Sequence, residues 1–242
     1  MVCPGLGGFE TIMGLQDAAT VADPSLNWGV TEGNPIQDAI RKIADQTGVD
    51  FSVDVTINRD HDITSVYAGE LSAVHRAACN DARISAMRKV GCLFDIVITT
   101  SSRYPVDLNL YQAVKGMLAA TQVVRKGGSI ICVAECSDGG PDQGGHNEIL
   151  SAAGSPKELL AMISSSGHNR HDQWQGQIQL DAKVYLKSDY LTARQVRTAH
   201  LDPIQDVEGT ISVLLEEYGQ DARICVLPPR STDDSVHGTR EN

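Results

Sequence analysis

The sequence predicts an α/β protein with a parallel, Rossmann-like sheet in its C-terminal part. Two short apolar runs, at 94–100 and 129–134, are typical of strands that are buried on both faces. A segment with helical periodicity, at about 107–125, separates them. A strand, a helix and a second strand in this order imply a parallel crossover. The fold class is therefore a doubly wound sheet, preceded by a smaller α+β segment.

The preceding segment is expected to contain a β-hairpin near 50–68. Apolar and polar residues alternate over 49–57, which predicts a strand with one buried face. The apolar side chains that share a face are Phe51, Val53, Val55 and Ile57. A polar turn follows, and 63–68 returns as the second strand. Helical periodicity predicts flanking helices at about 36–46 and 71–89.

Further elements continue the α/β alternation. Helices are expected near 156–165, 171–182, 190–196 and 207–218, and strands at 183–186 and 223–227. Prolines 228 and 229 end the last strand. The predicted organisation is an α+β segment at 1–85, an α/β domain at 86–229 and a disordered polar tail at 230–242.

Charge and composition exclude several function classes. The formal charge is −11, which argues against binding to nucleic acid or to an anionic membrane surface. No apolar run is long enough to span a bilayer, and the first residues do not resemble a signal peptide. Six scattered cysteines without metal-type spacing predict reduced, mostly buried thiols. We therefore expect a cytoplasmic protein.

The helix at about 107–125 carries the strongest candidate site. Ligands of open parallel sheets bind beyond the carboxyl ends of the strands, where this helix begins. Gln112 and Lys115 are three residues apart and so are neighbours, away from the apolar stripe of the helix. An amide and an ammonium there can bind a carboxylate. The alternative is that Lys115 is an ordinary solvated lysine.

The sequence contains two other, weaker candidate sites. His168, His171 and Asp172 resemble part of a metal cluster, although a polar loop before a helix explains them as well. Cys136 follows a predicted strand, where a thiol could be exposed, but no histidine is placed to activate it.

Several longer segments resemble one known family. They are PGLGGFETI (4–12), EGNPI (32–36), FDIVITT (94–100), YPVDLNLYQAVKGM (104–117), GGSIICVAECSDG (127–139) and DQWQ (172–175). The chain thereby resembles the nickel-dependent lactate racemase family, mainly its C-terminal domain, over nearly its whole length.

This resemblance implies a two-lobed enzyme that acts on a 2-hydroxy acid through a nickel-pincer nucleotide. The cofactor takes the α-hydrogen as hydride, and a histidine takes the hydroxyl proton. Gln112 and Lys115 match the substrate-binding amide and lysine of the family. Trp174 matches a tryptophan near the substrate, and Tyr111 lies beside the cofactor. For Trp174, an amphipathic packing role remains the alternative.

The chain also departs from the family pattern. The acid/base histidines, the cofactor's lysine tether and a nickel-binding histidine have no counterparts here, so neither a catalytic nor a metal-binding residue is assigned. We expect the chain to bind a substrate carboxylate without completing catalysis, and to need a partner chain that supplies the N-terminal lobe, or to self-associate. The alternatives are a non-catalytic carboxylate-binding or assembly domain and an inactive truncated paralogue.

Overall fold

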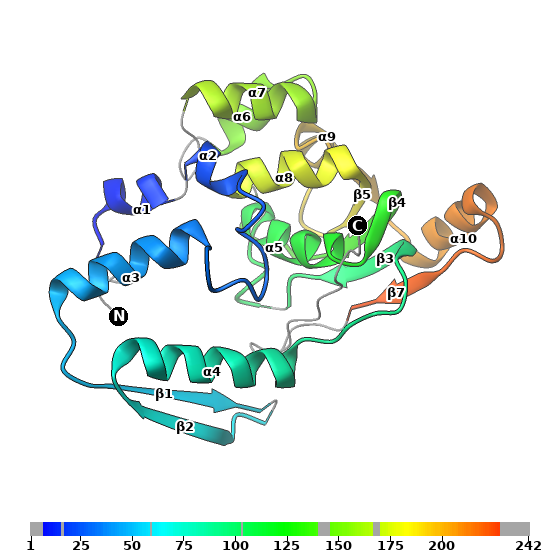
Figure 1. Cartoon of the computed structure of the whole chain (residues 1–242). Coiled ribbons are helices and arrows are strands. Elements are labelled where there is room, and N and C mark those ends of the chain that lie inside the picture. Colours follow the sequence, from blue (N-terminus) through cyan, green and yellow to red (C-terminus); the bar gives the residue numbers. More distant parts are fainter. Residues whose placement is uncertain are drawn as a thin grey trace. The chain divides into compact units, whose positions relative to one another are not determined.

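The computed structural model describes residues 7–15, 17–58, 60–102, 104–139, 146–166 and 170–227. These residues form two compact units that divide after Met87, and each unit is described by itself. Figure 1 labels the helices and strands. Cys3 and the predicted tail at 230–242 lie outside the described residues.

The second unit is built on a parallel sheet. Its strands, in spatial order, are β6 (Asp202–Ile204), β5 (Ala182–Lys187), β4 (Val124–Val133), β3 (Phe94–Thr100) and β7 (Ile224–Val226). Each neighbouring pair runs parallel. Ile96, Val97, Ile130 and Ile131, in the two central strands, are fully buried. The predicted parallel α/β sheet is therefore confirmed.

Helices cover both faces of this sheet (Figure 1). The helices of the unit are α5 (Leu110–Thr121), α6 (His146–Ala152), α7 (Pro156–Ser166), α8 (Arg170–Asp181), α9 (Ala193–Thr198) and α10 (Val207–Tyr218). Helices α5 and α8 pack against each other and on one face. Leu214 of α10 packs with Ile96 and Ile131 on the opposite face. Because both faces of β3 and β4 are covered, the sequences of these strands are continuously apolar rather than alternating.

Some boundaries differ from the sequence prediction. Helix α5 begins at Leu110 rather than near 107, because the Asn109 side chain caps it by accepting a hydrogen bond from the Gln112 N–H (3.1 Å). Strand β4 already begins at Val124, inside the predicted helix. Strand β6 was not predicted because it is short and contains Pro203, which only an edge strand tolerates.

The first unit contains a two-stranded antiparallel sheet. Its elements are α1 (Phe9–Leu15), α2 (Ala18–Val21), α3 (Pro35–Thr47), β1 (Ser52–Ile57), β2 (Ile63–Gly69) and α4 (Leu71–Ala86). Strands β1 and β2 form the predicted hairpin, with Val53 opposite Ala68 and Val55 opposite Val66. Helix α4 packs on one face of it.

The buried side of the hairpin is the reverse of the expected one. The alternation is correct, but Phe51 and Val53 are more than 60% exposed. The polar residues Ser52 and Thr56 are half-buried, on the face that α4 covers. On that face the Tyr67 hydroxyl donates to the Asp81 carboxylate of α4. Helix α4 therefore packs on the polar side of β1 and leaves its apolar side open.

Candidate functional site at the carboxyl edge of the sheet

A close contact between α5 and the end of β3 fixes the position of the candidate helix. The Thr99 hydroxyl donates to the Gly116 carbonyl oxygen (3.2 Å). A Cβ atom on Gly116 would lie 2.7 Å from the Thr100 carbonyl oxygen, so only glycine allows this approach. The Ser101 hydroxyl adds a hydrogen bond to the Gln112 carbonyl oxygen (3.2 Å). The first turns of α5 are thus fixed at the carboxyl end of the strand.

Gln112 and Lys115 lie on the accessible side of α5. Both side chains are half-buried, whereas the apolar stripe of the helix is closed to solvent. That stripe consists of Leu110, Ala113, Val114 and Met117, each at most 3% exposed. With a spacing of three residues, Gln112 and Lys115 are neighbours on the helix surface. A carboxylate could contact both, although this role stays a prediction.

The other two predicted residues lie on or beside the same helix. Tyr111 is half-buried, and its ring meets the ring of the buried His146 edge to face, with 5.4 Å between centroids. Trp174 is half-buried on α8, the helix that packs against α5. Next to it, the buried Gln175 side chain donates to the Ala199 carbonyl oxygen (2.8 Å), which holds α8 in place.

Asp107 joins the loops that follow β3 and β4. Its carboxylate accepts a hydrogen bond from the Glu135 N–H (3.1 Å), and its carbonyl oxygen accepts one from the Cys136 N–H (2.9 Å). Asp107 is 5% exposed, and its second carboxylate oxygen has no hydrogen-bond partner among the described residues. The sequence analysis placed this residue in the helix and missed its role, which depends on a loop that is distant along the chain.

The thiol at this edge is not exposed. Cys136 is fully buried, and burial together with the nearby Asp107 carboxylate raises the pKa of its thiol to about 12. A group with this pKa stays protonated at neutral pH and is a poor nucleophile. The sequence-based alternative of an exposed thiol at Cys136 is therefore wrong.

No set of three or more His, Cys, Asp or Glu side chains in the described part of the chain could hold a metal ion. His168 and the side chains of His171 and Asp172 lie outside the described residues. The described residues thus do not fit the ligand set of a nickel centre. None of the described helices has both the length and the apolarity to cross a membrane.

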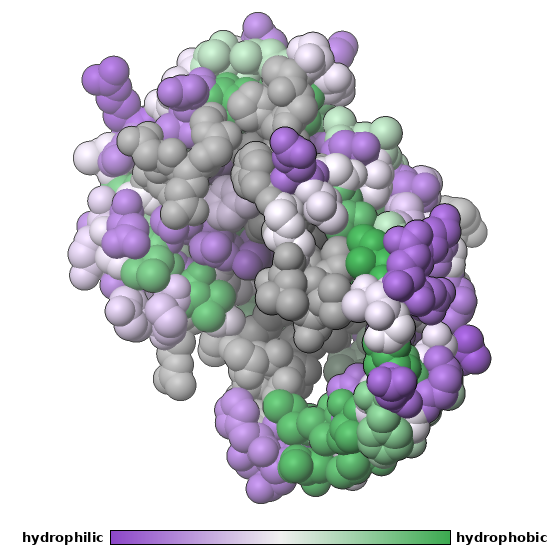
Figure 2. Space-filling view, turned by 90° about the vertical axis from the view of Figure 1, so that its left-hand side faces the viewer, coloured by the Kyte–Doolittle hydropathy of each residue, from purple (hydrophilic) through white to green (hydrophobic). Residues whose placement is uncertain are grey.

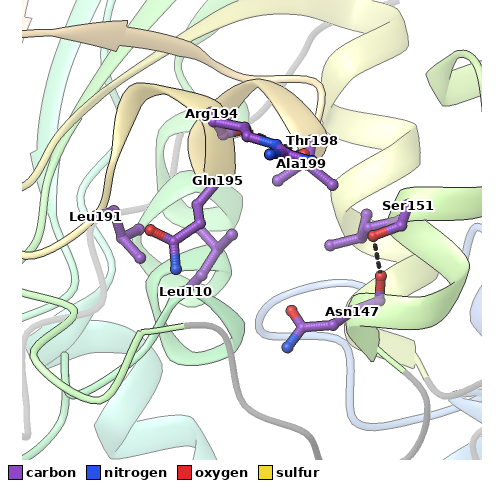
Figure 3. Close-up of a pocket in the computed structure, with 9 residues that line it drawn as sticks. Leu110, Asn147, Ser151, Leu191, Arg194, Gln195, Thr198 and Ala199 are labelled. Carbon is purple, nitrogen blue, oxygen red and sulfur yellow. Dashed lines mark hydrogen bonds between the residues drawn. The ribbon is translucent and has the colours of Figure 1, made fainter.

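A cavity of about 240 Å³ opens at the same edge of the sheet (Figure 3). Its walls come from the start of α5, from α6, and from the segment that follows β5, including α9. The lining residues are Leu110, Asn147, Leu150, Ser151, Leu191, Arg194, Gln195, Thr198 and Ala199. Figure 3 shows the amides of Gln195 and Asn147 facing the cavity from opposite walls.

Two side chains of the cavity lining offer hydrogen-bond donors to a ligand. The Gln195 side-chain oxygen accepts bonds from the N–H and hydroxyl of Thr192, so its amide nitrogen is the end left for a ligand. Arg194 adds a guanidinium, which only donates. The buried residues Leu110 and Leu191 form apolar walls. Such a lining suits a small anion with an aliphatic body.

Comparison with known proteins identifies the family. A family model described as the lactate racemase C-terminal domain matches residues 90–231. The chain belongs to the lactate racemase family. The matched region contains the whole parallel sheet and all four predicted site residues.

Curated lactate racemases match beyond this domain. Those of Thermoanaerobacterium thermosaccharolyticum and Lactiplantibacillus plantarum are each 29% identical to the chain over 234 residues. Each match covers 94% of this chain and 54% of the racemase. The chain therefore spans about half the length of these relatives.

Solved structures agree with the family assignment. The lactate racemase apoprotein of T. thermosaccharolyticum superposes with a TM-score of 0.84 at 26% identity, covering 95% of this chain and 55% of that one. A Thermotoga maritima protein has a TM-score of 0.56 at 11% identity, with 85% of this chain and 54% of that one covered, and shares the fold alone.

Proposed function

We propose that this chain binds the carboxylate of a small 2-hydroxy acid as part of a lactate racemase-type enzyme. The observation that carries the proposal is the half-buried pair of Gln112 and Lys115 at the carboxyl edge of the sheet. The Lys115 ammonium pairs with the carboxylate, and the Gln112 amide donates to one of its oxygens. Trp174 lines the substrate side and Tyr111 the cofactor side of this site.

In this proposal the chain positions the substrate and does not itself break bonds. A nickel-pincer nucleotide, when bound to the complete enzyme, supplies a hydride acceptor. Because the described residues do not fit a metal-ligand set, we assign this chain no step at the metal. The proton-transferring and cofactor-holding groups come from the part of a racemase that this chain does not match. We place this enzyme in the cytoplasm, where thiols stay reduced.

Calorimetric titration of the chain with L-lactate and with D-lactate tests the carboxylate site. Lys115→Ala is expected to weaken binding about tenfold or more, because it removes a charge-assisted hydrogen bond. Lys126→Ala is the matched control, since that exposed lysine lies on β4 and pairs with Asp181. Equal lactate affinity in wild type and Lys115→Ala would refute the assignment.

The cavity of Figure 3 supports a second candidate function, that of a non-catalytic domain for small carboxylates. Its donors, Arg194 and Gln195, and its leucine walls favour a short aliphatic acid. Here Arg194→Ala should weaken lactate binding about tenfold, while Lys115→Ala leaves it unchanged. Arg197→Ala, one turn along α9 and outside the cavity lining, is the control. The two variants together decide which site holds the acid.

A further inference from the structure

The open face of the hairpin exposes a group of apolar side chains in the first unit. It contains neighbouring side chains from both strands and from the residue before β1, and Figure 2 shows it as a continuous hydrophobic patch. The exposed fractions are 64% for Phe51, 62% for Val53, 41% for Val55, 37% for Ile57 and 62% for Val66. A contiguous apolar patch of this kind marks an interaction surface.

The other face of the hairpin already has its partner. Helix α4 packs there, with Val74 and Ala78 buried. Strands β1 and β2 pair only with each other among the described strands, so no other described strand extends the hairpin at either edge. An isolated two-stranded hairpin is marginally stable in water, and packing against a helix, here α4, provides the stability that it lacks.

The size of the face helps to decide what covers it. Two strands of about six residues present a surface of roughly 20 Å by 10 Å. A stable complex between two separate proteins buries about 800 Å² of accessible surface on each partner, so the outline of the hairpin face alone provides only part of such an interface. A second copy of this chain, stacked on the hairpin alone, would therefore be held weakly. The size of the face instead fits one part of a larger interface.

The comparisons indicate which polypeptide provides the rest of that interface. The curated matches cover 94% of this chain, so the matched span extends well beyond the C-terminal domain into the first unit. The same matches cover only 54% of each racemase. The racemases thus carry a large polypeptide, unmatched here, beside an equivalent first unit.

We infer that the Phe51, Val53, Val55, Ile57 and Val66 face docks an apolar surface of the polypeptide that corresponds to the unmatched part of lactate racemase. This inference deepens the proposed function, on which it rests for the identity of the partner. Docking converts the α4–hairpin pair into a three-layer arrangement and buries the valines. It also brings the polypeptide that carries the missing catalytic groups to the first unit.

The test uses the double variant Val53→Thr/Val66→Thr. Threonine is also β-branched, so the strands keep their preferred conformation while the face gains two hydroxyl groups. Val226→Thr is the matched control, because Val226 lies on a strand of the other unit and is 65% exposed. The probe is the unmatched part of the T. thermosaccharolyticum racemase, produced as a separate chain, with the corresponding part of the L. plantarum racemase as a second probe.

Sedimentation velocity and calorimetry give the result. We expect the wild type and Val226→Thr to bind at least one probe with equal affinity, and the double variant to bind about tenfold or more weakly. Absence of binding to both probes, once circular dichroism shows that they are folded, or equal binding by the double variant, overturns the inference. A wild-type homodimer that the double variant loses also overturns it, in favour of a second copy. Lactate affinity, which the hairpin variants should not change, reports separately on the carboxylate site.

Discussion

The two sheets of this chain place β-branched side chains in different surroundings, buried in one sheet and exposed in the other. In the parallel sheet Ile96 and Ile131 are fully buried, because helices cover both faces. In the hairpin Val53 and Val66 are 62% exposed, because α4 covers only the polar side. Among the described apolar residues of the first unit, those that are buried are Val21, Val74 and Ala78. A strand sequence thus shows that an apolar side needs a partner, but not that the same unit provides it.

The largest expected difference in stability is between a substitution in the closed core of the sheet unit and one on the open face of the hairpin. Ile131→Ala should lower the free energy of unfolding of the sheet unit by about 2–5 kcal/mol, because it leaves a cavity among packed side chains. Val53→Ala should change stability by about 0.5 kcal/mol or less, since water already reaches this side chain. Urea denaturation followed by circular dichroism measures both. Equal losses would show that the hairpin face is covered within the chain itself.

A smaller effect on stability is expected when one glycine in each unit is replaced by alanine. Gly116→Ala should cost about 1–3 kcal/mol, because the new methyl group meets the Thr100 backbone, which cannot move without shifting β3. Gly14→Ala in α1 has open space around it and should be neutral or stabilising by up to about 1 kcal/mol. Thermal unfolding of the two variants gives the comparison. A neutral Gly116→Ala would contradict the close contact that positions Lys115.

The smallest effect concerns a carboxylate that links three segments of the sheet unit. Asp95 accepts hydrogen bonds from Arg125 Nε (2.6 Å) and from the Arg223 N–H (2.8 Å), and these hold the pKa of its carboxyl below the usual value. Because the pKa of this carboxyl is lower in the folded chain than in the unfolded chain, the ionised group stabilises the folded state at pH values above the unfolded pKa. This contribution is lost as the pH falls through the folded pKa. Asp95→Asn should therefore cost about 1 kcal/mol at pH 7 and progressively less as the pH falls below the usual carboxyl pKa of about 4.

Asp45→Asn is the control for this pH dependence, because Asp45 is exposed on α3 of the other unit. It should change stability by less than about 0.5 kcal/mol at either pH. Urea denaturation at pH 7 and pH 3 distinguishes the two variants. A difference between wild type and Asp95→Asn that is equal at both pH values would refute the electrostatic explanation.

Local sequence patterns predicted most elements of the sheet unit. The apolar run at 94–100 and the helical period around Val114 depend on neighbours that are close along the chain. The pair of Gln112 and Lys115 was found for the same reason, because helical spacing alone makes them neighbours. Asp107, Arg194 and Gln195 were missed, since loops and short helices that are distant in sequence bring them to the carboxyl edge.

The sequence by itself determined the fold class, the hairpin and the family, because periodicity and motif spacing are local properties of the chain. Only the tertiary structure decided which side of the hairpin is covered. Alternation records that two faces differ, but α4 packs on the polar one, and no pattern within the strands specifies that choice. The tertiary structure also buried Cys136 beside Asp107, because burial depends on which loops meet above the sheet.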